Sequence, residues 1–347
     1  SVKDLRHDLF TGIKNKSCRI CWNAESHGLE SLRKIYNKEF FKHTRKDQFK
    51  NLLDWDSQTL PVTFELRLGN LCNLKCVMCD ATSSSKILEE YKKNQQHYSD
   101  LIEYIIPDTT IDYSWPESAE FLKFSQYLKT AKFIKITGGE PFMNPYILDI
   151  LDQIENKKEV VLNLTTNGTI KNKRILKSLS QFKTIWFTVS IDDMFDRYEY
   201  VRQGANWNKL VNNLTFFKKL PNTYFSVSVV VQAVNAIACA DLFAYIDSLG
   251  FKINIIFLNF PTYLHINSLP DKVKQKAIDN LKNLKVSPSN QQQVISTIDY
   301  LEKSKYDKYL LEKMIQYFQT LDKIRNTDFL SIFPEFTPVV ELADTPV

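Results

Sequence analysis

The stretch CNLKCVMC, residues 72–79, carries three cysteines in the spacing C-x3-C-x2-C. It directly follows residues 62–68, a run rich in β-branched and aromatic residues that predicts a β-strand. The loop is therefore expected at the carboxyl end of a strand, where the active sites of α/β barrels lie. Thiolates bind iron–sulfur clusters, and three of them leave one iron of a four-iron cluster open. The loop predicts a 4Fe–4S site at Cys72, Cys76 and Cys79.

Zinc is the alternative occupant of these thiols, because it also binds cysteine thiolates. A zinc site would need a fourth ligand close to the loop. The nearest histidine in the sequence, His97, follows Cys79 only after a predicted helix. The ligand count therefore favours an iron–sulfur cluster.

Beyond residue 62, short apolar runs alternate with longer amphipathic stretches, as in βα units that build a parallel sheet. The predicted strands are 62–68, 133–137, 160–165, 185–191, 224–231 and 253–258. The predicted helices between and after them are 84–95, 146–154, 173–180, 207–219, 240–249, 271–284, 290–303 and 310–326. Six units are too few for a closed eight-fold barrel, so the predicted fold class is α/β, a partial (β/α)6 barrel with helical N- and C-terminal extensions.

Changes in composition divide the chain into three predicted regions. Residues 1–60 form a lysine-rich N-terminal extension that contains a CxxC pair and is expected to be helical over 29–53. Residues 61–265 form the partial barrel, with an insertion at about 98–130. Residues 266–347 form a helical C-terminal region that ends in a proline-rich tail.

Polar motifs stand at the ends of the later strands. Residues 138–141 read Gly-Gly-Glu-Pro, and paired glycines let a backbone approach a ligand closely, while the acid and the proline fix the turn. Asn167 follows the third strand, Ser190 and Asp192 end the fourth, and Arg202 lies in a Y-x3-R-x-G segment. An arginine offers a forked donor that suits a carboxylate.

These motifs resemble the radical S-adenosylmethionine (SAM) superfamily, and the Y-x3-R-x-G segment resembles its peptide-modifying, SPASM/Twitch-type branch. The resemblance covers residues 62–260. It implies that the amino and carboxyl groups of SAM bind the open iron, and that an electron from the cluster splits SAM to a 5′-deoxyadenosyl radical. The hard chemistry would then belong to the cofactors.

The resemblance also implies roles for single residues. Gly138, Gly139, Glu140 and Pro141 would form the turn that holds the SAM amino group, Ser190 would contact the ribose beside Asp192, and Arg202 would pair with the SAM carboxylate. Asn167 and Gln232 stand at strand ends where cofactor or substrate could be met. The alternatives are a buried serine, a helix cap at Asp192, a solvated arginine and polar loop residues. No residue beyond the cluster ligands is assigned a catalytic role.

The N-terminal pair Cys18 and Cys21 has ligand spacing but no obvious completion. SPASM and Twitch clusters are usually bound by cysteines after the barrel, and no cysteine follows Cys239 here. The pair could hold a second iron–sulfur cluster with Cys239, bind zinc with His27 or His43, or consist of two packed thiols. Cys239 alone fits a small buried residue of a helix.

The composition of the chain limits the classes of partner that it requires. The chain of 347 residues has a formal net charge of +5, too small to require a nucleic-acid or membrane partner. The sequence shows no membrane-spanning apolar run and no recognisable signal peptide, so a cytoplasmic protein is expected. Cysteines clustered for metal binding fit a reducing compartment.

Three functions remain open at this point. The first is hydrogen abstraction from a peptide or protein side chain, with electrons from a donor such as flavodoxin or ferredoxin. The second is radical modification of a nucleotide or tRNA, because nucleic acid is not excluded by the charge. The third is a cluster-binding sensor without turnover.

Overall fold

The computed structural model describes residues 2–26, 31, 33–34, 37–38, 61–98 and 119–339. The chain divides into two compact units, Ser1–Pro61 and Val62–Val347. Most of the predicted helical stretch 29–53 and most of the predicted insertion 98–130 lie outside the described residues. In the smaller unit the described elements are α1 (Val2–Phe10), η1 (Lys16–Cys18) and α2 (Arg19–Ser26).

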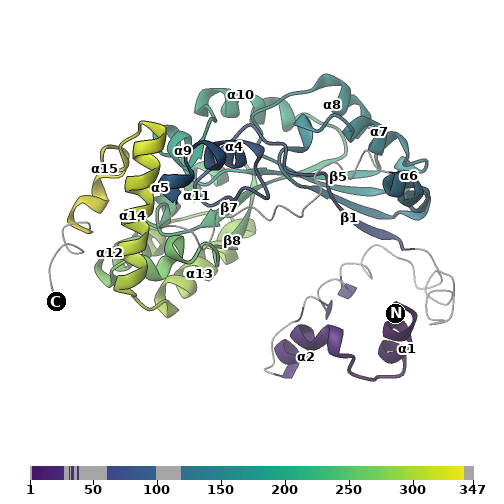
Figure 1. Cartoon of the computed structure of the whole chain (residues 1–347), viewed down its shortest axis with the longest axis horizontal. Coiled ribbons are helices and arrows are strands. Elements are labelled where there is room, and N and C mark those ends of the chain that lie inside the picture. Colours follow the sequence, from purple (N-terminus) through teal and green to yellow (C-terminus); the bar gives the residue numbers. More distant parts are fainter. Residues whose placement is uncertain are drawn as a thin grey trace. The chain divides into compact units, whose positions relative to one another are not determined.

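A six-stranded, all-parallel sheet forms the centre of the larger unit (Figure 1). Its order is β1-β3-β4-β5-β7-β8, so β1 and β8 are the edges. The strands are β1 (Thr63–Arg67), β3 (Phe133–Thr137), β4 (Val161–Thr166), β5 (Thr184–Ser190), β7 (Thr223–Val231) and β8 (Lys252–Phe257). All six predicted strands are confirmed to within one residue at each end, and with them the α/β class.

Helices form the crossover connections between successive strands, and further helices come after β8 in the sequence (Figure 1). Polar caps begin several of them: the side chains of Ser84, Asn172, Asn206 and Asp307 accept first-turn amides of α4, α8, α10 and α14. The described helices of this unit are α4 (Ser85–Lys93), α5 (Gln95–Tyr98), α6 (Ala119–Ser125), α7 (Ile147–Asp152), α8 (Lys173–Leu179), α9 (Phe195–Val201), α10 (Trp207–Phe217), α11 (Cys239–Ser248), α12 (Asp271–Asn283), α13 (Pro288–Lys303), α14 (Lys308–Arg325) and α15 (Phe329–Ile332).

The two faces of the sheet differ in chemistry. In β5 the side chains of Ile185, Phe187 and Val189 are fully buried, while the alternate residues Thr188 and Ser190 are half-buried. Strand geometry sends successive side chains to opposite faces, so one face builds the apolar core. The other face is lined by hydroxyl and amide groups, and we call it the polar sheet face: Thr165, Thr188, Ser190, Ser226, Ser228 and Asn254.

Several of the described elements were not predicted. A two-stranded antiparallel ribbon pairs β2 (Lys75–Cys76) with β6 (Arg202–Gln203), and α9 leads into it. The expected proline-rich tail instead contains α15 and η11 (Pro334–Phe336), because Phe329, Phe333 and Phe336 are buried. Among the described helices, none combines the length and the apolar character that a bilayer crossing requires.

Candidate functional site

The cysteine loop lies beyond the carboxyl end of β1, as its sequence predicts. Cys72 and Cys76 are buried and Cys79 is half-buried, and the three pack in one small cluster with Leu74. Serines at the start of α4 hold the loop backbone: Ser84 Oγ donates to the Leu74 carbonyl at 2.6 Å. The loop is thus held by α4, and its own residues 75–76 form the strand β2 that pairs with β6.

Burial disfavours the charged form of each thiol. It raises the pKa of Cys72, raises that of Cys76 to about 11 and raises that of Cys79 further, while Arg202 opposes the shift at Cys76. Thiols with raised pKa values stay protonated at neutral pH and lose their protons to a bound metal. The donor set therefore suits thiolate coordination and not free nucleophilic cysteines.

The Gly138–Gly139 turn packs directly on the start of the cysteine loop. A Cβ atom at Gly139 would lie 2.3 Å from the Leu71 carbonyl oxygen, and one at Gly138 would lie 2.7 Å from that of Gly69. The amide of Gly139 donates to the Gly69 carbonyl at 2.9 Å. The glycines thus permit contact between two backbones of this chain, and their contact with SAM stays a prediction.

Glu140 joins the ends of β3 and β4 from within the core. Its buried carboxylate accepts the Thr166 hydroxyl at 2.7 Å, the Asn167 amide at 2.7 Å and the Phe142 amide at 3.0 Å. Burial raises the pKa of Glu140 against the effect of these donors. Its side chain is therefore occupied by the protein, and Pro141 begins the following turn.

Asn167 connects the end of β4 to the cysteine loop. Its side-chain amide donates to Asn73 Oδ1 at 2.9 Å and lies 4.0 Å from the sulfur of Cys72. Asn73 in turn donates to the Thr169 hydroxyl at 2.9 Å. The predicted site residue Asn167 therefore lies beside the predicted cluster ligands.

Arg202 and Asp192 form a buried ion pair next to the loop. Arg202 Nη2 lies 2.7 Å from Asp192 Oδ2, and Arg202 Nη1 lies 3.8 Å from the sulfur of Cys76. Although burial opposes it, the Asp192 carboxylate raises the pKa of Arg202, which stays charged. The Val230 amide donates to the other Asp192 oxygen at 2.8 Å. A guanidinium beside a thiolate ligand lowers the local negative charge that three thiolates would create.

Gln232 and Ser190 complete the predicted set. Gln232, at the end of β7, is fully buried, and neither atom of its side-chain amide has a hydrogen-bond partner within the described residues. Buried polar groups normally have hydrogen-bond partners, so a side-chain amide without one at the carboxyl end of β7 suits a bound ligand. Ser190 is half-buried on the polar sheet face.

The residues present fit a 4Fe–4S cluster and SAM, on the evidence of the three thiols and the unpaired Gln232 amide. In the described parts of the chain, no three His, Cys, Asp or Glu side chains converge on one point as the ligands of a single metal ion would. Each thiolate of a four-iron cluster binds a different iron atom, so such convergence is not needed there.

Cys18 and Cys21 belong to the smaller unit and are both half-buried, in η1 and α2. Trp22 beside them donates its indole N–H to the Asn15 carbonyl at 3.0 Å. His27 and His43, the candidate zinc ligands, lie outside the described residues. The binding of a second cluster or of zinc by Cys18 and Cys21 stays a prediction.

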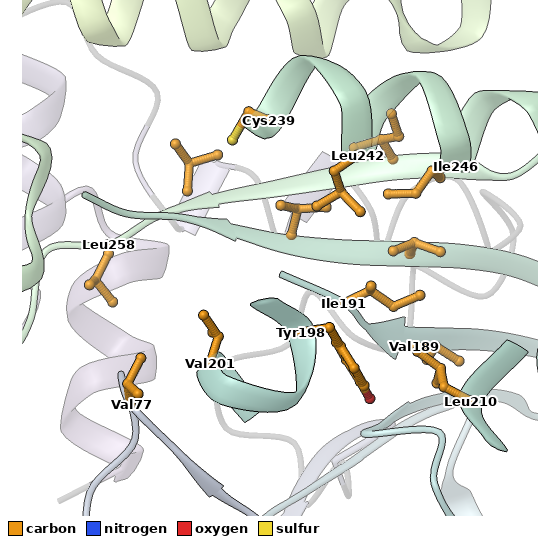
Figure 2. Close-up of a cluster of buried hydrophobic side chains, with 14 of the residues drawn as sticks. Val77, Val189, Ile191, Tyr198, Val201, Leu210, Cys239, Leu242, Ile246 and Leu258 are labelled. Carbon is orange, nitrogen blue, oxygen red and sulfur yellow. The ribbon is translucent and has the colours of Figure 1, made fainter. Parts of the chain in front are cut away.

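Cys239, in the larger unit, begins α11 among apolar side chains such as Leu242 (Figure 2). It has no exposed surface, and burial raises its thiol pKa. Its sulfur lies 3.9 Å from Asn235 Oδ1. This environment is that of a packed core cysteine, and its assignment as a ligand stays a prediction.

Several residues around the loop were not foreseen from the sequence. Asn73 lies inside the motif itself, where a polar residue between two ligands could have been noticed. Glu90 and Tyr317 contact the loop from α4 and α14, but they lie in ordinary amphipathic helices without a motif. No local signal in the sequence marks them.

Comparison with known proteins agrees with this site. The family model described as the radical SAM superfamily matches residues 66–235. The probable GTP 3′,8-cyclase of Methanocaldococcus jannaschii is 20% identical over 222 residues, which cover 62% of this chain and 67% of that protein. The GTP 3′,8-cyclase of Aquifex aeolicus is 24% identical over 238 residues, which cover 67% of this chain and 66% of that protein.

A solved structure described as native anSMEcpe with bound AdoMet aligns with a TM-score of 0.44 and 21% identity, covering 65% of this chain and 63% of the other. The chain thus spans about two thirds of the length of these relatives. The matched segment contains the three loop cysteines, the Gly-Gly-Glu-Pro turn and Arg202. Residues 66–235 of this chain therefore form a radical SAM domain, the kind of domain that works with a 4Fe–4S cluster and SAM.

Proposed function

We propose that the chain cleaves SAM reductively at a cluster bound by Cys72, Cys76 and Cys79 and abstracts a hydrogen atom from a peptide or protein side chain. When bound, the cluster supplies the electron that splits SAM, and SAM supplies the radical. The chain's own residues would hold these groups: Asn167 and Arg202 lie at the sulfurs of Cys72 and Cys76. The carbonyl groups of Gly138 and Gly139 would accept hydrogen bonds from the SAM amino group, because the Gly139 amide already donates to Gly69.

The choice of a peptide rests on the charges around the site. The described cations Lys75, Arg197, Arg202 and Arg325 are each paired with a carboxylate of this chain. At the β1–β3 edge, Lys135 and Arg67 share Glu65, at 3.2 and 3.8 Å. A triphosphate is best bound by unpaired arginines and lysines. The polar sheet face, with its hydroxyl and amide groups, suits an uncharged amide backbone instead.

A nucleotide substrate is the second candidate, and the named relatives favour it, because two of them are GTP 3′,8-cyclases. We also propose a cytoplasmic location and an electron donor of the flavodoxin or ferredoxin type. A clustered set of buried, unpaired thiols is suited to a reducing compartment.

The test is SAM cleavage by the reconstituted chain under anaerobic conditions with dithionite. We expect 5′-deoxyadenosine from the wild type and none from Cys76→Ala. A pool of short synthetic peptides should then raise the rate above the unstimulated level, and GTP should not. A rate that GTP raises and the peptides leave unchanged would favour the nucleotide substrate, and a cluster-loaded chain without any deoxyadenosine would contradict the proposal altogether.

A further inference from the structure

Helix α14, near the C-terminus, contacts the cysteine loop directly. The hydroxyl of Tyr317 donates to the carbonyl of Val77 at 2.7 Å, although the two residues are 240 positions apart. The amide of Val77 donates in turn to the carbonyl of Val201 at 2.9 Å. Val77 lies between the second and third cysteines, and its side chain is packed near Val201 in the apolar cluster (Figure 2). Both the amide and the carbonyl group of Val77 are thus hydrogen-bonded.

A second contact reaches the loop through Glu90 of α4. Arg325, at the end of α14, donates to Glu90 at 2.8 and 3.1 Å, and Tyr98 donates to it at 2.9 Å. Lys75, the residue before Cys76, donates to the same carboxylate. The side chains of Arg325 and Glu90 are 4% and 5% exposed, so loss of Glu90 leaves the buried charge of Arg325 without its carboxylate, and loss of Arg325 leaves Glu90 with Lys75 as its cation.

A third contact holds the end of α9, which leads into β6, the other strand of the ribbon. The hydroxyl of Tyr200 donates to Asp322 Oδ1 at 2.9 Å, and Tyr200 lies two residues before Arg202. Tyr317, Asp322 and Arg325 all lie in the second half of α14. One helix therefore touches the turn after β2 and the approach to β6, and it reaches β2 itself through Glu90.

We propose that Tyr317 and Arg325 are positioning residues of the cluster site, so that α14 fixes the geometry of the peptide between Cys76 and Cys79. The inference rests on the cluster assignment within the proposed function. Loss of a group that orients the ligands of a metal site typically costs roughly 10- to 100-fold in metal affinity. Neither residue lies within the segment that matches the superfamily model.

Two substitutions in the full-length, anaerobically reconstituted chain test this. Tyr317→Phe removes the hydroxyl that holds Val77, and Glu90→Gln weakens the bridge between Arg325 and Lys75. Tyr309→Phe is the matched control, because Tyr309 lies on the same helix and is 61% exposed. Each protein is reduced with dithionite, its electron paramagnetic resonance spectrum is recorded with and without SAM, and iron release to a chelator is timed.

We expect both test variants to shift the g-values of the reduced cluster and to release iron roughly tenfold faster than the wild type, with Tyr309→Phe unchanged. The spectrum reports only chains that hold a cluster, so a smaller folded fraction cannot imitate the shift. Wild-type spectra and release rates in both variants would overturn the inference, even if their melting temperatures fall. A wild-type chain that takes up no cluster would overturn the proposed function as well.

Discussion

Glu140 shows how one buried carboxylate holds two strand ends together beside the site. Both of its oxygens accept hydrogen bonds, one of them from the Asn167 amide at 2.7 Å. In Glu140→Gln, an NH2 group must face one of these donors. We expect a loss of about 1–3 kcal/mol in the free energy of unfolding, the usual cost of an unsatisfied buried group.

Denaturant unfolding measures this loss, and Glu65→Gln is the control, because the Glu65 side chain is 37% exposed. Its ion pairs with Lys135 and Arg67 lie at the surface and are worth at most about 1 kcal/mol. Equal losses in the two variants would contradict a special role for Glu140.

Asp193 predicts a pH dependence of stability. Burial raises the pKa of its carboxyl to about 6, although Arg197 opposes the shift at 3.0 Å. In the unfolded chain the pKa is about 3.9. The folded state therefore binds more protons between these values, and stability falls as the pH rises from about 4 to about 6, by on the order of 3 kcal/mol from this group.

The expected result is that Asp193→Asn removes this slope. Unfolding free energies of wild type and variant at pH 5 and pH 7 measure it, and the difference between the two proteins should be larger at pH 7, in favour of the variant. A difference that does not change with pH would show that Asp193 titrates normally.

At the scale of elements, the turn after β3 depends on the absence of a side chain. Gly139→Ala would place a methyl group 2.3 Å from the Leu71 carbonyl oxygen, a contact that only a backbone shift can relieve. We expect a stability loss of about 3 kcal/mol or more and slower cluster uptake. The control is Gly250→Ala, where φ is +73° but the nearest atom is 4.0 Å away, so that only about 1–2 kcal/mol of backbone strain is added.

Thermal unfolding and the rate of iron incorporation distinguish the two glycines. If Gly139→Ala costs no more than Gly250→Ala, the close packing of the turn on the cysteine loop is not what requires the glycine.

The long elements were predictable and the short ones were not. The six parallel strands each span five or more residues and alternate or combine apolar side chains that become buried, which is why their bounds could be read from the sequence. The β2–β6 ribbon has only two residues in each strand, and its pairing depends on contacts between residues 75–76 and 202–203. Helix α15 forms between the buried side chains of Phe329 and Phe333, and no local pattern of proline and polar residues could indicate that burial.

The residues of the candidate site likewise divide into those that could be predicted from the sequence and those that could not. Residues next to strand ends, such as Asn167 and Asp192, could be named because parallel strands bring their carboxyl ends together, and Arg202 could be named from its Y-x3-R-x-G segment. The partners of those residues could not, since Asn73, Glu90 and Tyr317 act through contacts made only in the folded chain. Motif spacing therefore predicts ligands better than it predicts the groups that orient them.

At the scale of the whole molecule, the iron content decides what the smaller unit does. If Cys18 and Cys21 bind a second cluster, the wild type holds about eight irons and a Cys18→Ala/Cys21→Ala variant holds about four. We expect this halving, with deoxyadenosine formation at the first cluster retained. Iron and sulfide analysis of both proteins measures it, and zinc in the wild type or an unchanged iron content would contradict a second cluster.

The 240-residue separation of Val77 and Tyr317 has a consequence for biosynthesis. Ribosomes add roughly 5–20 residues per second, so the loop cysteines leave the tunnel about 12–50 s before the helix that fixes their peptide. During that interval the thiols are accessible to oxidants and to wrong metals. Cluster delivery is therefore best made after α14 has been synthesised and has folded against the loop.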